Sequence, residues 1–419
     1  MRSRPNYSSG RSTDAMPPLK LVVLGTLAAN PYAGMAWMHM QIAVGLQRLG
    51  HDVHYLETSS NWPYDPIRGQ KVCDSRYALP YLTRVCESFG LGDRWAYRRS
   101  YSDRAWFGPA ATEGERLLRE ADAVLNVAGA TRLSEDGLQA GRLVYLGTDP
   151  VYHEVTYRAG DEETRAIVDE HDDVVTYGEN IGTPVTPVEP LPRQRATTRQ
   201  PVLMDLWLDG PPTRDEFTTV ANWRQEGREV ELDGERYLWS KDTEFLKFVE
   251  LPRRSGRRLE LAMNLARPET IRYGEGEPVR AWGVDEQAYA LLEASGWALA
   301  DAREFTSDPW PYRDYVQASR GEFTVARDLH VRLRSGWFSE RSACYLAAGR
   351  PVVAQDTGFD QVLPTGEGLF SFRTMDDVLE AFEAIDGDYE RHSQAARLLA
   401  EEYFRAETVL ARLLADLGR

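Results

Sequence analysis

Cysteine is scarce in this chain of 419 residues: it occurs only as Cys73, Cys86 and Cys344, with no C-x-x-C spacing. An odd number of cysteines without paired spacing argues against a disulfide framework and a structural zinc site, and it suits a reducing compartment. The sequence also lacks the uncharged apolar run of about 18 residues that a membrane-spanning helix requires. Residues 1–16 are rich in Arg and Ser and have no apolar segment typical of a signal peptide, so we expect a disordered leader there and a cytoplasmic protein.

Acidic residues outnumber basic ones, and lysine is scarce. The formal net charge of −16 argues against a general binder of nucleic acid or of anionic membranes, although it leaves room for a local phosphate pocket. Lysine occurs only at positions 20, 71, 241 and 247, so a lysine at the start of a predicted helix stands out. Hydrophobic residues at 42% and charged residues at 27% are typical of a globular protein.

The beginning of the chain predicts a β-α-β unit. An apolar run closed by glycine, Leu19–Gly25, is followed by helical spacing over Ala36–Leu49 and a second strand over Asp52–Leu56. Such a unit predicts a parallel sheet flanked by helices, which is the α/β class.

The length and one irregular segment predict two domains. Glu189–Arg199 is rich in Pro, Arg and Thr and lacks periodicity, so we expect an N-terminal domain over 17–188, a linker over 189–200, a C-terminal domain over 201–390, and a helix over 391–419 that packs toward the N-terminal domain. Two α/β halves place a ligand in the interdomain cleft, at the carboxyl ends of the strands. Further strands are predicted at Ala123–Val127, Arg142–Leu146, Asp173–Tyr177, Val202–Leu206, Phe217–Ala221, Leu259–Met263, Ala298–Ala302 and Pro351–Ala354. Helices are predicted at Asp242–Glu250, Glu286–Ser295, Pro311–Ala318, Ser339–Ala348, Met375–Ala384 and Tyr389–Leu413.

The most informative stretch is Ser335–Gly358, which predicts a loop, a helix beginning near Ser339, a strand and a polar loop. A helix N-terminus offers free N–H groups and partial positive charge, which suits a diphosphate. Ser342 adds a hydroxyl and Arg341 a planar cation. A capped helix before a strand explains the same residues without a ligand, and the residues alone leave both interpretations open.

Within this stretch, the run Ala347-Ala-Gly-Arg-Pro-Val-Val353 resembles the A-x-G-x-P-V-V signature near the donor site of GT-B glycosyltransferases. The resemblance implies two Rossmann-like domains, an N-terminal one for the acceptor and a C-terminal one for the nucleotide sugar, with a cleft between them. It also implies a diphosphate site formed by Gly336, Ser339, Arg341 and Ser342. Residues near the sugar hydroxyls would be Gln355, Asp356, Thr357 and Gly358.

The chain departs from that family at two positions. Retaining members carry a pair of glutamates where this chain has Gly336 and Cys344. Cys344 removes the carboxylate expected at the ribose hydroxyls. Either another group such as Glu340 makes that contact, or the nucleotide is seated differently.

A second patch resembles the first strand, loop and helix of a GT-B C-terminal domain. It runs from Phe217 to Arg224 and continues at Ser240–Lys247. Lys241 corresponds to the lysine that binds phosphate, with Asn222 or Arg224 as its partner at the strand end. A solvent-facing lysine is the alternative, although a cation at a helix start is unfavourable.

Three residues of the N-terminal half are further candidates. Gly34 resembles the loop glycine that retaining GT-B enzymes bring close to the donor phosphate, and an ordinary loop glycine is the alternative. His39 is a candidate catalytic base, but the position that holds the histidine of inverting members is Met35, so His39 could simply pack on the sheet. Asp149 follows a predicted strand and is a candidate base or acceptor ligand, with a turn-forming Asp-Pro as the alternative.

Other polar groups resemble parts of the donor pocket or follow strands. Glu322, in a run similar to S-x-x-E, is a candidate ribose or sugar ligand, with a surface carboxylate as the alternative. Glu179 and Asn180 follow a predicted strand in the same way as Asp149.

These features predict a glycosyltransferase that moves a sugar from an NDP-sugar to a small-molecule acceptor without a cofactor or bound metal. Retention is favoured by a small margin, because the Gly34 loop is present and the inverting histidine is not. The alternatives are an NDP-sugar epimerase of the same fold and a non-catalytic sugar-nucleotide-binding protein. We expect no nucleic-acid partner and no membrane span, and we leave a homodimer open.

Overall fold

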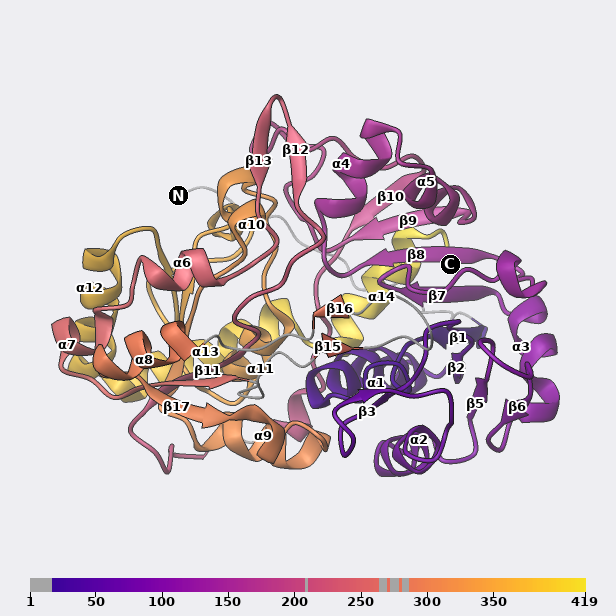
Figure 1. The fold of residues 1–419 in the computed structure, drawn as a ribbon, viewed down its shortest axis with the longest axis horizontal. Helices are drawn as coiled ribbons and strands as arrows, with labels where there is room; N and C mark the ends of the chain where they lie inside the picture. Colours follow the sequence, from indigo (N-terminus) through magenta and orange to yellow (C-terminus); the bar gives the residue numbers. More distant parts are fainter. Residues whose placement is uncertain (1–16, 208–209, 264–269, 272–278, 281–285) are drawn as a thin grey trace, which may run out of the picture.

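The computed structural model describes residues 17–207, 210–263, 270–271, 279–280 and 286–419 (Figure 1). The predicted leader at 1–16 lies outside these residues. The described chain forms two α/β halves, each built around a central sheet with helices packed on it. The predicted α/β class with two Rossmann-like halves is confirmed.

The sheet of the first half has the strand order β10-β9-β8-β7-β1-β2-β5-β6. Its pairs are parallel except for β5 with β6, so the carboxyl ends of its main strands share one edge. The strands are β1 (Lys20–Leu24), β2 (Asp52–Glu57), β5 (Trp95–Arg98), β6 (Trp106–Phe107), β7 (Ala123–Val127), β8 (Leu143–Gly147), β9 (Asp173–Thr176) and β10 (Gln194–Thr197).

The sheet of the second half has the order β17-β14-β11-β18-β19-β20, and all its pairs are parallel. Its strands are β11 (Phe217–Ala221), β14 (Leu259–Met263), β17 (Ala298–Asp301), β18 (Gly321–Thr324), β19 (Val352–Gln355) and β20 (Leu369–Phe372). Three hairpins lie outside the two sheets: β3 (Tyr64–Asp65) with β4 (Gln70–Lys71), β12 (Val230–Leu232) with β13 (Glu235–Tyr237), and β15 (Thr270–Ile271) with β16 (Val279–Arg280).

Helices connect the strands, as the β-α-β pattern predicts. Those of the first half are α1 (Ala33–Arg48), α2 (Ala78–Ser88), α3 (Gly114–Glu120), α4 (Tyr152–Ala159) and α5 (Glu162–Asp169). Those that follow are α6 (Asp242–Leu246), α7 (Leu251–Ser255), α8 (Glu286–Ala294), α9 (Pro309–Ala318), α10 (Asp328–Leu333), α11 (Glu340–Ala347), α12 (Met375–Gly387), α13 (Tyr389–Tyr403) and α14 (Ala406–Asp416).

Two predicted elements are wrong, and one contact explains both. The predicted strand Val202–Leu206 is instead a single bridge at Val202 followed by a 3-10 turn at Met204–Leu206. The predicted helix Tyr389–Leu413 is broken into α13 and α14. Val202 donates its N–H to the carbonyl of Phe404 (2.7 Å) and accepts from the N–H of Ala406 (2.9 Å), which takes this backbone out of the helical pattern. Local periodicity does not reveal a break that a distant segment imposes.

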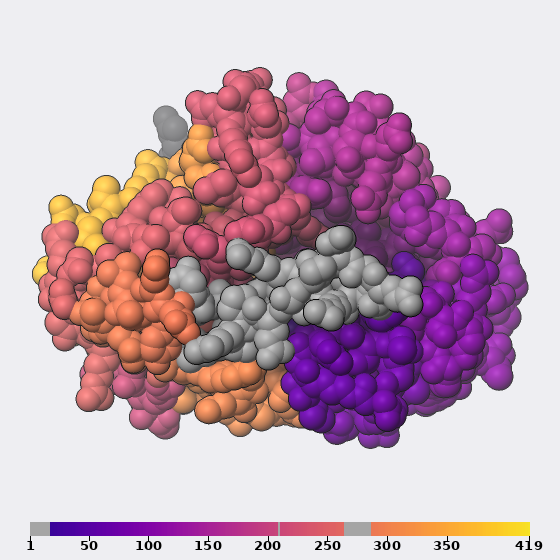
Figure 2. Space-filling model, viewed as in Figure 1, coloured from indigo at the N-terminus to yellow at the C-terminus, as the bar shows by residue number. Residues whose placement is uncertain are grey.

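The two halves share extensive packing. α14 lies against α1, where a Cβ on Gly45 would come within 2.5 Å of Leu410, so this close approach needs a glycine. The hairpin β12–β13 stands beside α4 (Figure 1 and Figure 2). Its Val230 and Tyr237 share a hydrophobic cluster with Val151 of the first half. The predicted linker at 189–200 contains strand β10, the edge of the first sheet. The polypeptide therefore crosses between the halves directly after an ordered strand.

Candidate functional site

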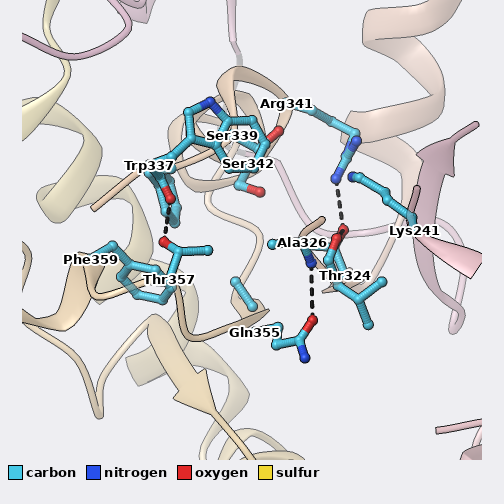
Figure 3. A pocket seen from close by; sticks show the side chains of 13 residues that line it. Lys241, Thr324, Ala326, Trp337, Ser339, Arg341, Ser342, Gln355, Thr357 and Phe359 are labelled. Carbon is cyan, nitrogen blue, oxygen red and sulfur yellow. Dashed lines mark hydrogen bonds between the residues drawn. The ribbon is translucent and has the colours of Figure 1, made fainter. Parts of the chain in front are cut away.

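A pocket opens at the carboxyl ends of β18 and β19, beside the start of α11 (Figure 3). This is the place where parallel α/β sheets usually hold ligands. Its empty space, of about 260 Å³, continues into solvent. The lining combines one lysine, one arginine, hydroxyl groups and aromatic rings: Lys241, Thr324, Val325, Ala326, Trp337, Phe338, Ser339, Arg341, Ser342, Ala354, Gln355, Thr357 and Phe359.

The first turn of α11 presents polar groups that the protein does not use. Ser339 is the N-cap residue, yet its side chain makes no capping hydrogen bond. The Ser342 hydroxyl is buried and has no hydrogen-bond partner in the described part of the chain. The first N–H groups of a helix also have no intrahelical acceptor. Both hydroxyls lie above the pocket in Figure 3, so this turn can bind an anion through side chains and backbone together.

Lys241 is a buried cation without a partner. It precedes α6 and is only 8% exposed, and no hydrogen bond or ion pair joins its ammonium group to another described residue. Burial, and then the positive charges of Arg341 and Arg327, hold the pKa of Lys241 well below its usual range. Figure 3 shows the end of its side chain beside the guanidinium group of Arg341. Two neighbouring basic side chains, one of them without a partner among the described residues, make this a candidate anion site.

Arg341 is held rigidly by its surroundings. Its guanidinium donates to the carbonyl of Val220 (2.6 Å), to the Thr324 hydroxyl (2.8 Å) and to the Glu322 carboxylate. Glu322 is fully buried and does not line the pocket. The residue predicted as a ribose or sugar ligand therefore lies under Arg341 and fixes its orientation.

The loop after β19 divides the predicted sugar ligands. Gln355 and Thr357 line the pocket, whereas Asp356 does not. Asp356 forms ion pairs with Arg334 (2.6 Å) and Arg373 (2.7 Å). Burial opposes its ionisation, but the N–H of Gly358 and these two guanidinium groups outweigh it and lower the pKa of Asp356. This carboxylate stabilises the loop from the side away from the pocket.

Predicted residues of both halves lie outside the pocket lining. Gly336 and Gly358 contact Asn180 instead. Gly34 lies in the first turn of α1, where an added Cβ would meet nothing within 4 Å. Arg224 forms an ion pair with Asp242 (2.9 Å), and Asn222 is half-buried after β11. The lining thus includes Lys241, Ser339, Arg341, Ser342, Gln355 and Thr357 of the predicted set, whose roles stay predictions.

His39 is fully buried in α1 and does not line the pocket. Its Nδ1 lies 2.7 Å from the carbonyl oxygen of Met35, and its ring packs on Tyr55. Burial lowers the pKa of His39 to about 4. A neutral core histidine of this kind agrees with the alternative interpretation of packing against the sheet.

Asp149, after β8, joins the halves. Its carboxylate accepts from Arg327 (2.7 Å) and lies 3.1 Å from Nε2 of His330, both in the second half. Burial opposes ionisation, but these two partners outweigh it and lower the pKa of Asp149 to about 2. His330 stacks on Trp337, a residue of the pocket lining (4.6 Å between ring centroids). Asp149 is therefore near the pocket but engaged in an ion pair.

Glu340, considered above as a replacement for the missing ribose ligand, also has protein partners. It accepts from the Gln41 amide (3.1 Å) and from the Cys344 thiol (3.3 Å). Burial raises the pKa of Glu340 to about 7. Cys344, at the position of the missing glutamate, is thus linked through Glu340 to Gln41 of α1 in the first half.

Sequence reasoning missed the aromatic part of the lining. Trp337 and Phe338 were part of the informative stretch but had no predicted role, and Thr324 ends β18, a strand that was not predicted. The short run Gly321–Thr324 mixes glycine with polar residues, so its composition gives little strand signal.

The described residues contain no group of three or more His, Cys, Asp or Glu side chains placed to hold a metal ion. Within the described part of the chain, no helix has the length and apolar character needed to cross a membrane. All three cysteines are free thiols.

The arrangement of the two halves is shared with known structures. HepE (Alr3699) from Anabaena, solved with UDP and glucose, aligns with a TM-score of 0.54 at 11% identity, over 96% of this chain and 99% of that one. An α-glucosyltransferase solved with UDP and a 13-mer DNA aligns with a TM-score of 0.54 at 9% identity, over 96% and 100% of the two chains. The chain has the GT-B fold.

This assignment concerns the fold, because the identities are far too low to transfer a substrate. No protein-family model and no curated protein sequence matches the chain. The GT-B resemblance in Ser335–Gly358 is thus supported by the three-dimensional arrangement rather than by overall sequence similarity.

Proposed function

We propose that the protein is a glycosyltransferase that moves a sugar from an NDP-sugar to a small-molecule acceptor. In this reaction the bond between C1 of the sugar and the diphosphate oxygen breaks, and a bond between C1 and an acceptor oxygen forms. The acceptor proton passes to the departing diphosphate. The step needs groups that stabilise the negative charge developing on that diphosphate.

The observation that carries the proposal is the unpartnered ammonium group of Lys241. A buried ammonium without a counter-ion is costly, and a protein retains such a group where a ligand supplies the opposite charge. The pocket that Lys241 lines also contains Ser339 and the unpartnered Ser342 hydroxyl, at the N-terminus of α11. A diphosphate would bind the lysine, both hydroxyls and the helix N–H groups at once.

The same groups make the proposed reaction independent of a metal ion, because cationic and dipolar groups of the protein meet the charge of the leaving diphosphate. Retention remains the favoured stereochemistry. His39 is buried away from the pocket, and Asp149 is neutralised by Arg327 and His330, so neither candidate base is poised to take an acceptor proton.

A small-molecule acceptor is favoured over DNA, although one structural neighbour was solved with DNA. The net charge of −16 opposes the binding of a polyanion. A cytoplasmic location agrees with three free cysteines.

The first test is a calorimetric titration of the full chain with UDP, GDP, ADP and TDP. We expect one of these to bind the wild type, and Lys241→Met to weaken that binding by about 100-fold, as expected when a buried charge pair loses one partner. Methionine keeps the buried stem and removes only the charge. Lys20→Met is the matched control, since Lys20 is exposed on β1. This variant should bind the nucleotide as tightly as the wild type does. Binding that is indifferent to Lys241 would overturn the proposed site.

The second test follows the product by NMR, using the sugar nucleotide of the base that binds. Transfer to an acceptor with the anomeric configuration kept is the expected result. A change of the sugar without any acceptor would instead indicate an epimerase. Binding without transfer or hydrolysis would indicate a non-catalytic protein.

A further inference from the structure

Asn180 of the first half inserts between two loops of the second half. It follows β9 and is only 2% exposed. Its side-chain N–H groups donate to the carbonyl oxygens of Arg334 (2.9 Å) and Gly358 (3.0 Å), and its backbone N–H donates to that of Ser335 (3.1 Å). One side chain thus ties together the loop before α11 and the loop after β19.

Two glycines shape the space that Asn180 occupies. A Cβ on Gly336 would lie 2.8 Å from the backbone nitrogen of Asn180, and one on Gly358 would lie 2.5 Å from its amide nitrogen. Both glycines have positive φ, of 78° and 86°. A side chain at either position would both strain the backbone and displace Asn180. We call Asn180 together with these two glycines the Asn180 socket.

The loops that form the socket also form the pocket. Trp337 and Phe338 follow Gly336, and Thr357 precedes Gly358, and all three residues line the pocket. The loops are bonded to one another as well, because Gly336 donates its N–H to the carbonyl of Thr357 (2.8 Å). Any shift of the socket therefore moves the wall of the pocket and the start of α11.

The segment that carries Asn180 is itself anchored. Glu179 forms an ion pair with Arg199 (2.5 Å), and the Thr183 hydroxyl donates to the carbonyl of Asn180 (2.7 Å). The Thr186 hydroxyl donates to the carbonyl of Leu333 in the second half. These contacts restrain the position of Asn180 relative to the two loops of the second half.

We propose that Asn180 is a positioning residue, through which docking of the first half onto the second assembles the diphosphate site. This inference rests on the proposed function, because it assigns Asn180 a role at the same site. Without the Asn180 side chain, the two loops lose the two hydrogen bonds that it donates to them, and the groups at the start of α11 are no longer preorganised for the ligand. The socket also accounts for the glycine that stands where retaining family members carry a glutamate.

The test uses substitutions in the full chain. Asn180→Ala removes both side-chain donors, and Asn180→Asp keeps the shape but places a carboxylate against two carbonyl oxygens. Gly336→Ala displaces Asn180 from the opposite side. Its matched control is Gly234→Ala, since Gly234 has a φ of 79° and nothing within 4 Å of an added Cβ. The control thus carries the backbone strain of the substitution without touching the socket.

The first measurement is amide hydrogen exchange without ligand. We expect faster exchange at 335–338 and 356–359 in Asn180→Ala, Asn180→Asp and Gly336→Ala, with α12 unchanged, and wild-type exchange in these loops for Gly234→Ala. The second is the affinity for the nucleoside diphosphate that binds the wild type. We expect it to weaken about tenfold in Asn180→Ala and further in Asn180→Asp, and to stay unchanged in Gly234→Ala.

The outcomes separate the two proposals. If the wild type binds none of UDP, GDP, ADP and TDP, the proposed function and with it the assigned role fail. If the wild type binds but the socket variants bind equally well, only the role of Asn180 is overturned. Unchanged exchange at both loops in Asn180→Ala would overturn it too, because the loops would then keep their positions without this side chain.

Discussion

Lys241 and Asp149 are ionisable side chains that influence each other electrostatically across the junction of the halves. They differ in whether the protein provides partners for their charged groups. Lys241 is left without a hydrogen bond or ion pair to another described residue, and its pKa is held low. Asp149 has two partners, Arg327 and His330, and its pKa falls to about 2. The ion pair of Asp149 joins the two halves, whereas Lys241 is the group that we propose binds a ligand.

The same contrast separates the two halves as candidate sites. The second half presents an open lysine and hydroxyl groups at a helix N-terminus. The first half contributes groups that are already engaged, such as Asp149 in its ion pair and Asn180 in its socket. If the proposed function holds, we expect the first half to shape the donor site rather than to contact the diphosphate.

The strongest test of this contrast is Asp149→Asn. The substitution keeps the shape but leaves Arg327 and His330 without their anion. We expect a loss of about 3 kcal/mol of unfolding free energy, the low end for breaking a buried pair, because the Asp149 side chain is 30% exposed. Urea denaturation measures this loss. Affinity for the nucleoside diphosphate should not fall, since the pocket becomes more positive. Intact stability combined with lost sugar transfer would instead assign Asp149 as the catalytic base.

A second prediction concerns His39, the other candidate base, which we expect to contribute to stability rather than to catalysis. Its pKa is about 4 in the folded chain and about 6.5 when unfolded, so the unfolded chain binds more protons between these values. The contribution of neutral His39 to the free energy of unfolding is therefore complete above pH 6.5 and is lost as the pH falls toward 4. Between pH 7 and pH 5 we expect the wild type to lose about 2 kcal/mol more unfolding free energy than His39→Gln, as measured by urea denaturation at both pH values. Loss of sugar transfer in His39→Gln, with equal pH dependence of stability, would contradict this assignment.

The sequence was sufficient where local pattern decides the structure. Strands β7, β11 and β14 have the predicted bounds, because each is a short run between clear breaks. In the pocket, Ser342 was found because helix N-termini can be located from sequence and bind anions by a general mechanism. Lys241 was found from the resemblance of its segment to a GT-B C-terminal domain.

The sequence was not sufficient where a distant segment decides. Asp356 and Gly358 follow the strand as predicted, but Arg334 and Asn180, remote along the chain, take them out of the pocket lining. Whether His39 faces a cleft or the core depends on how α1 packs on Tyr55, which periodicity alone does not show. These residues share a cause: their roles are set by tertiary contacts rather than by their neighbours in sequence.

Lys241 should make the binding of a nucleoside diphosphate depend on pH. Because its pKa is depressed in the free protein, binding of a diphosphate should raise that pKa, so that a proton is taken up on binding at pH values between the two pKa values. Affinity is then greatest below the pKa of Lys241 in the free protein. It falls by at most about tenfold per pH unit until the pKa of the complex is reached. Calorimetry in buffers of different ionisation enthalpy measures the proton directly, and Lys241→Met should show no such uptake. Equal uptake in both proteins would place the proton elsewhere.

The smallest expected effect concerns stability without ligand. Lys241→Met removes an unpaired buried ammonium that lies beside Arg341, so the free energy of unfolding should rise by about 1 kcal/mol. In a chain of 419 residues a rise of that size corresponds to about 1 °C in Tm, which differential scanning calorimetry resolves. Lys20→Met should leave Tm unchanged, because Lys20 is exposed and its ion pair with Glu120 is long at 3.9 Å. A lower Tm for Lys241→Met would mean that the charge supports the fold. A higher Tm combined with weaker nucleotide binding would mean that the chain gives up stability at this position to keep a charge for the diphosphate.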